Sequence, residues 1–74
     1  MFAKMKINKE IKKCQKNIEQ LEKLRYRSQA ALVEAILKNE SPSDDDVDYF
    51  NKYTSQIETF RDRIQELKKQ LETE

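Results

Sequence analysis

The feature that most constrains this chain is a polar break at residues 39–46, which separates two long segments with helical periodicity. The break carries the only proline of the 74 residues, and the chain has no glycine. Ser41, Pro42 and Asp44 suit the N-cap, first and third positions of a helix, so they predict that a second helix begins at about residue 42. Ser43 has an acidic residue at the same spacing and is the alternative cap, one half-turn later. The break therefore predicts a turn between two helices.

The segment before the break repeats apolar residues at alternating spacings of four and three, as one face of an α-helix does. These residues are Ile7, Ile11, Cys14, Ile18 and Leu21. The pattern predicts a first helix over about residues 3–38. Further along, the same register passes through Arg25 and Ser28, so the apolar seam becomes smaller and more polar toward the break.

The segment after the break has the most regular heptad pattern in the chain, which predicts a second helix over about residues 42–72. Its seam consists of Phe50, Tyr53, Ile57, Phe60, Ile64, Leu67 and Leu71. A run of aspartates, Asp44–Asp46 and Asp48, lies at its beginning, where the positive end of the helix dipole favours negative charge. We interpret this run as a helix start. It does not have the spacing of a calcium loop, so no metal site is expected.

Folding the chain at a turn of residues 39–42 brings the two seams together. Positions whose numbers add to about 81 become opposite, which places Leu71 opposite Ile11 and Leu67 opposite Cys14. The fold class predicted for residues 1–74 is therefore all-α, a single antiparallel coiled-coil hairpin of two helices.

A hairpin of this size has little core, because burial of about ten large side chains roughly balances the entropy of ordering the chain. A second apolar stripe on another face of the first helix predicts a protein interface. Its residues are Tyr26, Ala30, Val33 and Leu37, with Val47 and Tyr49 across the turn. The simplest partner is a second copy, which predicts a homodimer in the form of a four-helix bundle. A larger protein partner is the other reading.

The charges are unevenly distributed along the chain. Residues 1–27 hold nine Lys/Arg and three Asp/Glu, whereas residues 28–59 hold two and seven. A basic face of the first helix offers an alternative function, the binding of nucleic acid through phosphate contacts. Its residues are Lys9, Lys12, Lys13, Lys16, Lys23 and Arg27. Glu10, Glu19 and Glu22 are expected to interrupt this face, and no aromatic residues lie among the lysines to stack on bases. Protein binding is therefore the preferred reading.

Composition argues against enzymatic chemistry. Histidine, the usual proton carrier near neutral pH, is absent, and a phosphate-binding loop needs glycine. We expect no enzyme activity, no cofactor and no metal. The single cysteine, Cys14, is predicted to be a buried structural thiol, and this sparing use of cysteine indicates the cytoplasm. No apolar run reaches 18 residues, so no contact with membranes is expected.

The segment Ser55-Gln56-Ile57-Glu58-Thr59 resembles the Ser-Gln-Glu-Leu-Asp signature of the short helical-hairpin aspartyl-phosphate phosphatases of sporulating bacteria. The first two residues match. Thr59 stands in the place of that family's catalytic aspartate, so the resemblance supplies no catalytic residue. RNA-binding plasmid regulators of the Rop type are similar in architecture alone. The sequence thus favours a small non-enzymatic protein that binds protein, as a homodimer or as an adaptor or inhibitor of a larger partner.

Overall fold

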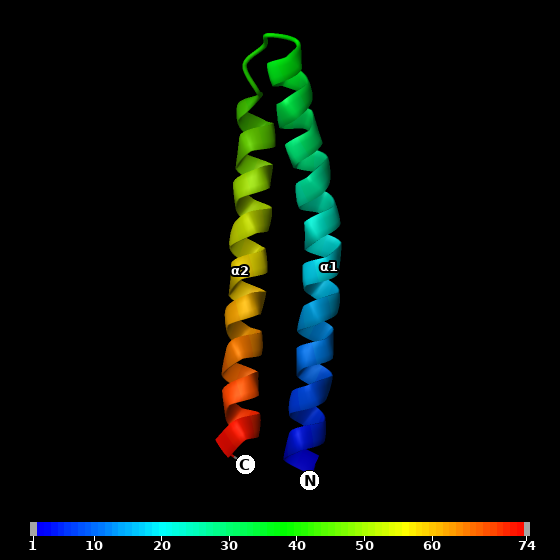
Figure 1. Ribbon diagram of the computed structural model, residues 1–74, viewed down its shortest axis with the longest axis vertical. Coiled ribbons are helices and arrows are strands. Elements are labelled where there is room, and N and C mark those ends of the chain that lie inside the picture. The colour runs from blue at the N-terminus through cyan, green and yellow to red at the C-terminus, as the bar shows by residue number, and fades with distance from the viewer. Residues whose placement is uncertain (1, 74) are drawn as a thin grey trace.

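Two long helices lie side by side in the computed structural model, which describes residues 2–73 (Figure 1). Helix α1 spans Phe2–Leu37 and helix α2 spans Asp44–Thr73. They run antiparallel, so both ends of the chain lie at one end of a rod of 57 × 15 × 15 Å and the turn lies at the other (Figure 1). The predicted all-α hairpin is confirmed. We call the two ends the open end and the turn end.

Helix α1 is closed at its C-terminus by Asn39, whose φ of 59° places it in the left-handed region. The Asn39 N–H donates to the carbonyl oxygen of Ile36 at 3.0 Å, and the Glu40 N–H donates to that of Ala35 at 2.8 Å. This pair of bonds is the Schellman motif, which satisfies the last free carbonyls of a helix. Asparagine is the residue after glycine that best tolerates this conformation, so it supplies the reversal in a chain without glycine.

Helix α2 begins at Asp44, two residues later than the predicted start at residue 42. The Ser43 hydroxyl oxygen accepts a hydrogen bond from the Asp46 N–H at 3.1 Å, so Ser43 is the N-cap. The expectation that Ser41 caps the helix is wrong, and the alternative cap is the one used. This start puts three aspartates into the first turn, where the helix dipole favours them.

The two seams pack in a register that is shifted toward the open end from the predicted one. Leu67 joins Ile7 and Ile11 in one apolar cluster, against which Ile64 and Leu71 pack. Leu71 therefore lies with Ile11 as predicted, whereas Leu67 packs nearer the open end than its predicted partner, Cys14. Figure 1 shows the reason: the loop descends before α2 begins, so α2 starts lower in the view than α1 ends.

Burial is concentrated away from the turn end of α1. The described side chains that are buried are Ile7, Ile11, Cys14, Ile57 and Leu67. From residue 15 to the end of α1 no described side chain is buried, and the seam there is half-buried at best. The small seam residues that the sequence places near the turn therefore leave that half of the hairpin with little core.

Candidate protein interface

The four predicted interface residues of α1 form one exposed apolar face near the turn end, which we call the outer stripe: Tyr26, Ala30, Val33 and Leu37. Tyr26 is 72% exposed, Val33 47% and Leu37 78%. They line a shallow groove together with Gln29 and Glu34. The sequence prediction that these side chains share a face outside the seam is therefore confirmed by their position.

The outer stripe points away from α2. Each residue of an α-helix is rotated by about 100° around the helix axis from the one before it. The average direction of Ala30 and Val33 is therefore about 150° around α1 from the average direction of the seam residues Ser28 and Leu32. No residue of α2 lines the groove of the outer stripe in the described part of the chain. The outer stripe is thus an apolar surface that the hairpin itself does not cover.

Val47 and Tyr49 do not extend the outer stripe, contrary to the sequence prediction. They are two residues apart, so their side chains leave α2 about 200° apart, on opposite flanks. Val47 is 38% exposed and Tyr49 50%. The Tyr49 ring stacks on that of Tyr53, with ring centroids 6.1 Å apart and planes at 17°. The six predicted interface residues therefore make one stripe on α1 and two separate apolar positions on α2.

Ile36 is an exposed apolar residue that was not among the predicted interface residues. It is 62% exposed in the structure. Most of the exposed large hydrophobic residues gather near the turn end: Tyr26, Val33, Ile36, Leu37, Val47 and Tyr49. The side chain of Ile36 lies next to the outer stripe, and it is exposed because this end of the hairpin has little core.

Two oppositely charged residues flank the outer stripe on the same side. Arg27 and Glu34 are seven residues apart, which is two helical turns, so they lie on one line along α1. Both are exposed. Glu34 pairs with Lys38 at 3.1 Å in an exposed contact between successive turns, and an exposed pair of this kind adds little stability. Both charges therefore lie where a partner on the outer stripe would meet them.

The basic face predicted on α1 is exposed along its whole length. Five of its residues recur at helical spacing, at positions 9, 13, 16, 23 and 27, with Lys12 beside them. None of the six forms an ion pair within the residues that the structure describes. The face is thus a row of free positive charges about 27 Å long.

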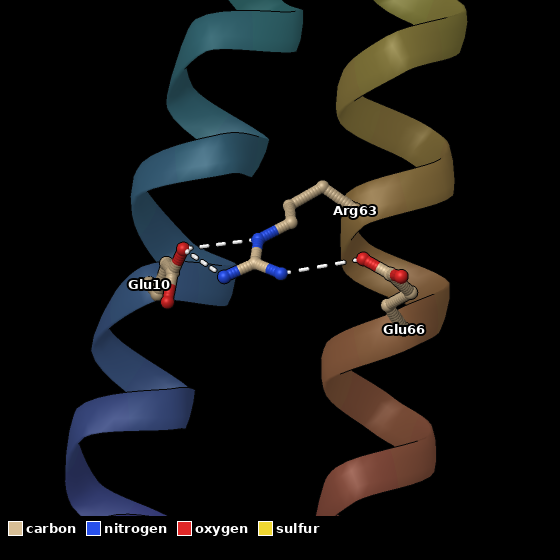
Figure 2. A network of polar contacts seen from close by, with 3 residues as sticks. All are labelled: Glu10, Arg63 and Glu66. Atoms are coloured by element: carbon tan, nitrogen blue, oxygen red, sulfur yellow. Dashed lines mark hydrogen bonds and ion pairs between the residues drawn. The ribbon is translucent and has the colours of Figure 1, made fainter.

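Glu10 and Glu22 do not interrupt the basic face as the sequence analysis expected. Glu10 pairs with Arg63 of α2 at 2.9 Å, and Glu22 pairs with Arg61 at 3.5 Å. Figure 2 shows the Glu10 carboxylate directed across the hairpin toward Arg63. Both carboxylates are therefore drawn toward α2, whereas Glu19 lies beside the basic face and has no partner among the described ion pairs.

The remaining candidate residues offer no reactive site. Cys14 is a free thiol that is 6% exposed, which confirms its predicted burial. Arg25 is half-buried, and no hydrogen bond or ion pair joins it to another residue between 3 and 73. The same part of the chain holds no group of three His, Cys, Asp or Glu residues that could bind a metal ion. Neither helix is long and apolar enough to cross a membrane within its described residues.

Comparisons of this chain with protein-family models, with curated proteins and with solved structures find no match.

Proposed function

We propose that this chain is a small non-enzymatic helical hairpin that acts by binding protein through the outer stripe, either a second copy of itself or a larger partner as an adaptor or inhibitor. One observation carries the proposal. The outer stripe exposes Tyr26, Val33 and Leu37 on the face of α1 that α2 leaves uncovered, in the half of that helix that has no buried side chain.

The energetics of burial support this role. Full burial of a large apolar side chain is worth about 1.5–3 kcal/mol. Covering the outer stripe would bury three such side chains and Ala30 between them. That gain must offset the loss of translational and rotational freedom on association, so a partner needs to cover the whole stripe.

Replacing Val33 and Leu37 with aspartate tests the proposal, because it places two charges where a partner would bury apolar surface. We expect this variant to lose the protein partners that the immobilised hairpin retains from the source cells, as identified by mass spectrometry. Met5→Asp is the matched control, since Met5 is also a large exposed hydrophobic residue, 66% exposed, but lies at the open end. If the native chain, the double variant and Met5→Asp all retain the same partners equally, the binding surface lies elsewhere.

The proposal includes a cytoplasmic setting. Its support is the single cysteine, which is free and buried in the apolar seam, as is usual where thiols stay reduced.

A second candidate function, binding of nucleic acid, is supported by the state of the basic face. Glu10 and Glu22 pair with α2, so they leave the row of basic residues on α1 without acidic partners in the described contacts. Such a row could neutralise phosphates along a duplex.

A salt titration of binding to generic duplex DNA and RNA tests this second function. Phosphate contacts release counterions, so log K should fall linearly with log salt, and Lys13→Gln with Lys16→Gln should reduce the slope by about 1 for each phosphate that is no longer neutralised. Lys68→Gln with Lys69→Gln is the matched control, because these two exposed lysines lie on α2. No binding at low salt would exclude this function.

A further inference from the structure

We infer that the outer stripe binds the outer stripe of a second copy of this chain, with the two α1 helices antiparallel and Arg27 of each copy facing Glu34 of the other. The inference rests on the proposed function, in which the outer stripe binds protein, and it commits to the partner and its orientation. Its basis is the self-complementarity of the stripe and of the charges beside it.

The apolar residues of the stripe match themselves when one copy is turned end for end. With a two-fold axis between residues 31 and 32, each residue lies opposite a residue of the second copy, and the numbers of the two residues add to 63. Tyr26 then meets Leu37 of the second copy, and Ala30 meets Val33. A dimer with two-fold symmetry requires this kind of match, because the same surface supplies both sides of the contact. Small Ala30 near the axis lets the two helices approach closely.

The charges beside the stripe match in the same orientation. Residues that flank a helical contact on the same side face each other across an antiparallel pair, and such residues set the orientation of coiled coils. Arg27 and Glu34 lie on opposite sides of the two-fold axis, so symmetry produces two pairs of opposite charge. In a parallel pair each flank would face the opposite flank of the second copy, so Arg27 and Glu34 would lie beside Gln29 and Ile36 and would form no pair of opposite charge. The charges therefore select the antiparallel dimer.

The residues on the other flank agree with this arrangement. Gln29 and Ile36 occupy it, and each faces the other across the axis. Ile36, which is 62% exposed in the hairpin, is thereby partly covered. Beyond the outer stripe, the acidic turn end of each hairpin points along the more basic half of the other.

The arrangement differs from four helices around a common core. Because the outer stripe faces away from α2, the helices of the dimer stand in a row, with the two α1 helices in the middle. The contact extends over the 12 residues of each α1 from Tyr26 to Leu37, or about 18 Å. A contact of one helix face on another lies at the small end of protein interfaces, so we expect a weak, reversible dimer.

Sedimentation equilibrium from roughly 1 µM to 1 mM, with helicity checked by circular dichroism, tests the inference. We expect the native chain to dimerise, and Arg27→Glu or Glu34→Arg alone to raise the dimer dissociation constant roughly tenfold at low salt. The double variant Arg27→Glu, Glu34→Arg should recover native association. An equimolar mixture of the two single variants should associate as well, because every Arg–Glu pair is then restored between unlike chains.

The outcomes separate this inference from the proposed function. A chain that is monomeric at about 1 mM overturns the second copy as partner, while the partner-capture experiment with Val33→Asp and Leu37→Asp still decides the proposed function. Dimerisation that persists in the Val33→Asp, Leu37→Asp variant places the dimer contact on another surface and overturns this inference, while the capture experiment again decides the proposed function. Dimerisation that this variant abolishes, but that the double charge exchange does not recover, overturns the antiparallel register alone.

Discussion

Arg63 of α2 donates two hydrogen bonds to one carboxylate oxygen of Glu10 in α1, from Nη2 at 2.9 Å and from Nε at 3.1 Å (Figure 2). Its third nitrogen, Nη1, donates to Glu66 at 3.3 Å. The hydrogen bond to Glu10 and then that to Glu66 raise the pKa of Arg63 above its ordinary value. The guanidinium thus joins residues 53 positions apart in sequence and helps to fix the register of the two helices at the open end.

We predict a salt-sensitive coupling between Arg63 and Glu10. Arg63→Ala and Glu10→Ala should each lower the melting temperature, and the double variant should lower it by less than the sum of the two, because either single change already breaks the contact. The coupling should shrink at about 1 M salt, since both groups are exposed and salt screens them. Additive effects at low salt would show that the contact does not stabilise the hairpin.

The pH dependence of this contribution follows from the direction of the Arg63 pKa shift. The folded-state pKa is raised, so the stabilisation is fully present below the ordinary pKa of arginine and is lost only as the pH rises through the raised value. Because Arg63 stays charged, its titration does not change the coupling free energy between Arg63 and Glu10 across the neutral pH range. The Arg61–Glu22 pair, a single contact at 3.5 Å, is the internal comparison and should show a weaker coupling.

The two helices and the residues of each seam could be predicted from periodicity, since apolar spacing reports directly which face of a helix is buried. The register could not. It depends on the path of the loop, and the sequence offered two N-caps, of which Pro42 favoured Ser41 over Ser43, the cap that the helix uses. A shift of about one turn preserves the heptad pattern on both helices, so periodicity is consistent with either register.

The candidate interface was predictable in part for the same reason. The outer stripe lies on one helix, where spacing alone places its residues together. The prediction included Val47 and Tyr49 because both lie near the turn, but their side chains leave α2 in different directions and do not continue the stripe. Ile36 was not among the predicted interface residues, and only the structure shows how little of the turn end is covered.

We predict that Ser43, and not Ser41, stabilises the start of α2. Ser43→Ala removes the oxygen that accepts the Asp46 N–H, so it should lower the free energy of unfolding by about 0.5–2 kcal/mol. Ser41→Ala is the matched control and should have little effect, because Ser41 lies in the loop before the helix. Urea unfolding measures both. An equal or larger loss at Ser41 would mean that the helix begins earlier.

We predict that Asn39→Gly stabilises the hairpin. Glycine adopts the positive φ of this position without the steric cost that asparagine bears, so the left-handed C-cap should form more easily. The gain should be some tenths of a kcal/mol to about 1 kcal/mol, reduced by the greater entropy of glycine in the unfolded chain. Asn39→Val should have the opposite effect, since a β-branched residue is strongly disfavoured at positive φ. Thermal unfolding of the three proteins tests the order.

The same substitution, Ile to Val, can compare the contribution to stability of a seam position in α2 with that of an exposed position in α1. Ile57 is fully buried, so removal of one methylene from it should cost about 0.5–1.5 kcal/mol of unfolding free energy, through reduced burial and the small cavity that remains. Ile36 is 62% exposed, and the same change there should stay within about 0.5 kcal/mol. Both variants are measured by urea unfolding at low micromolar concentration, where a weak dimer is dissociated. A loss at Ile36 as large as that at Ile57 would mean that the turn end is packed within the single chain, and the surface proposed for a partner would then be part of the core.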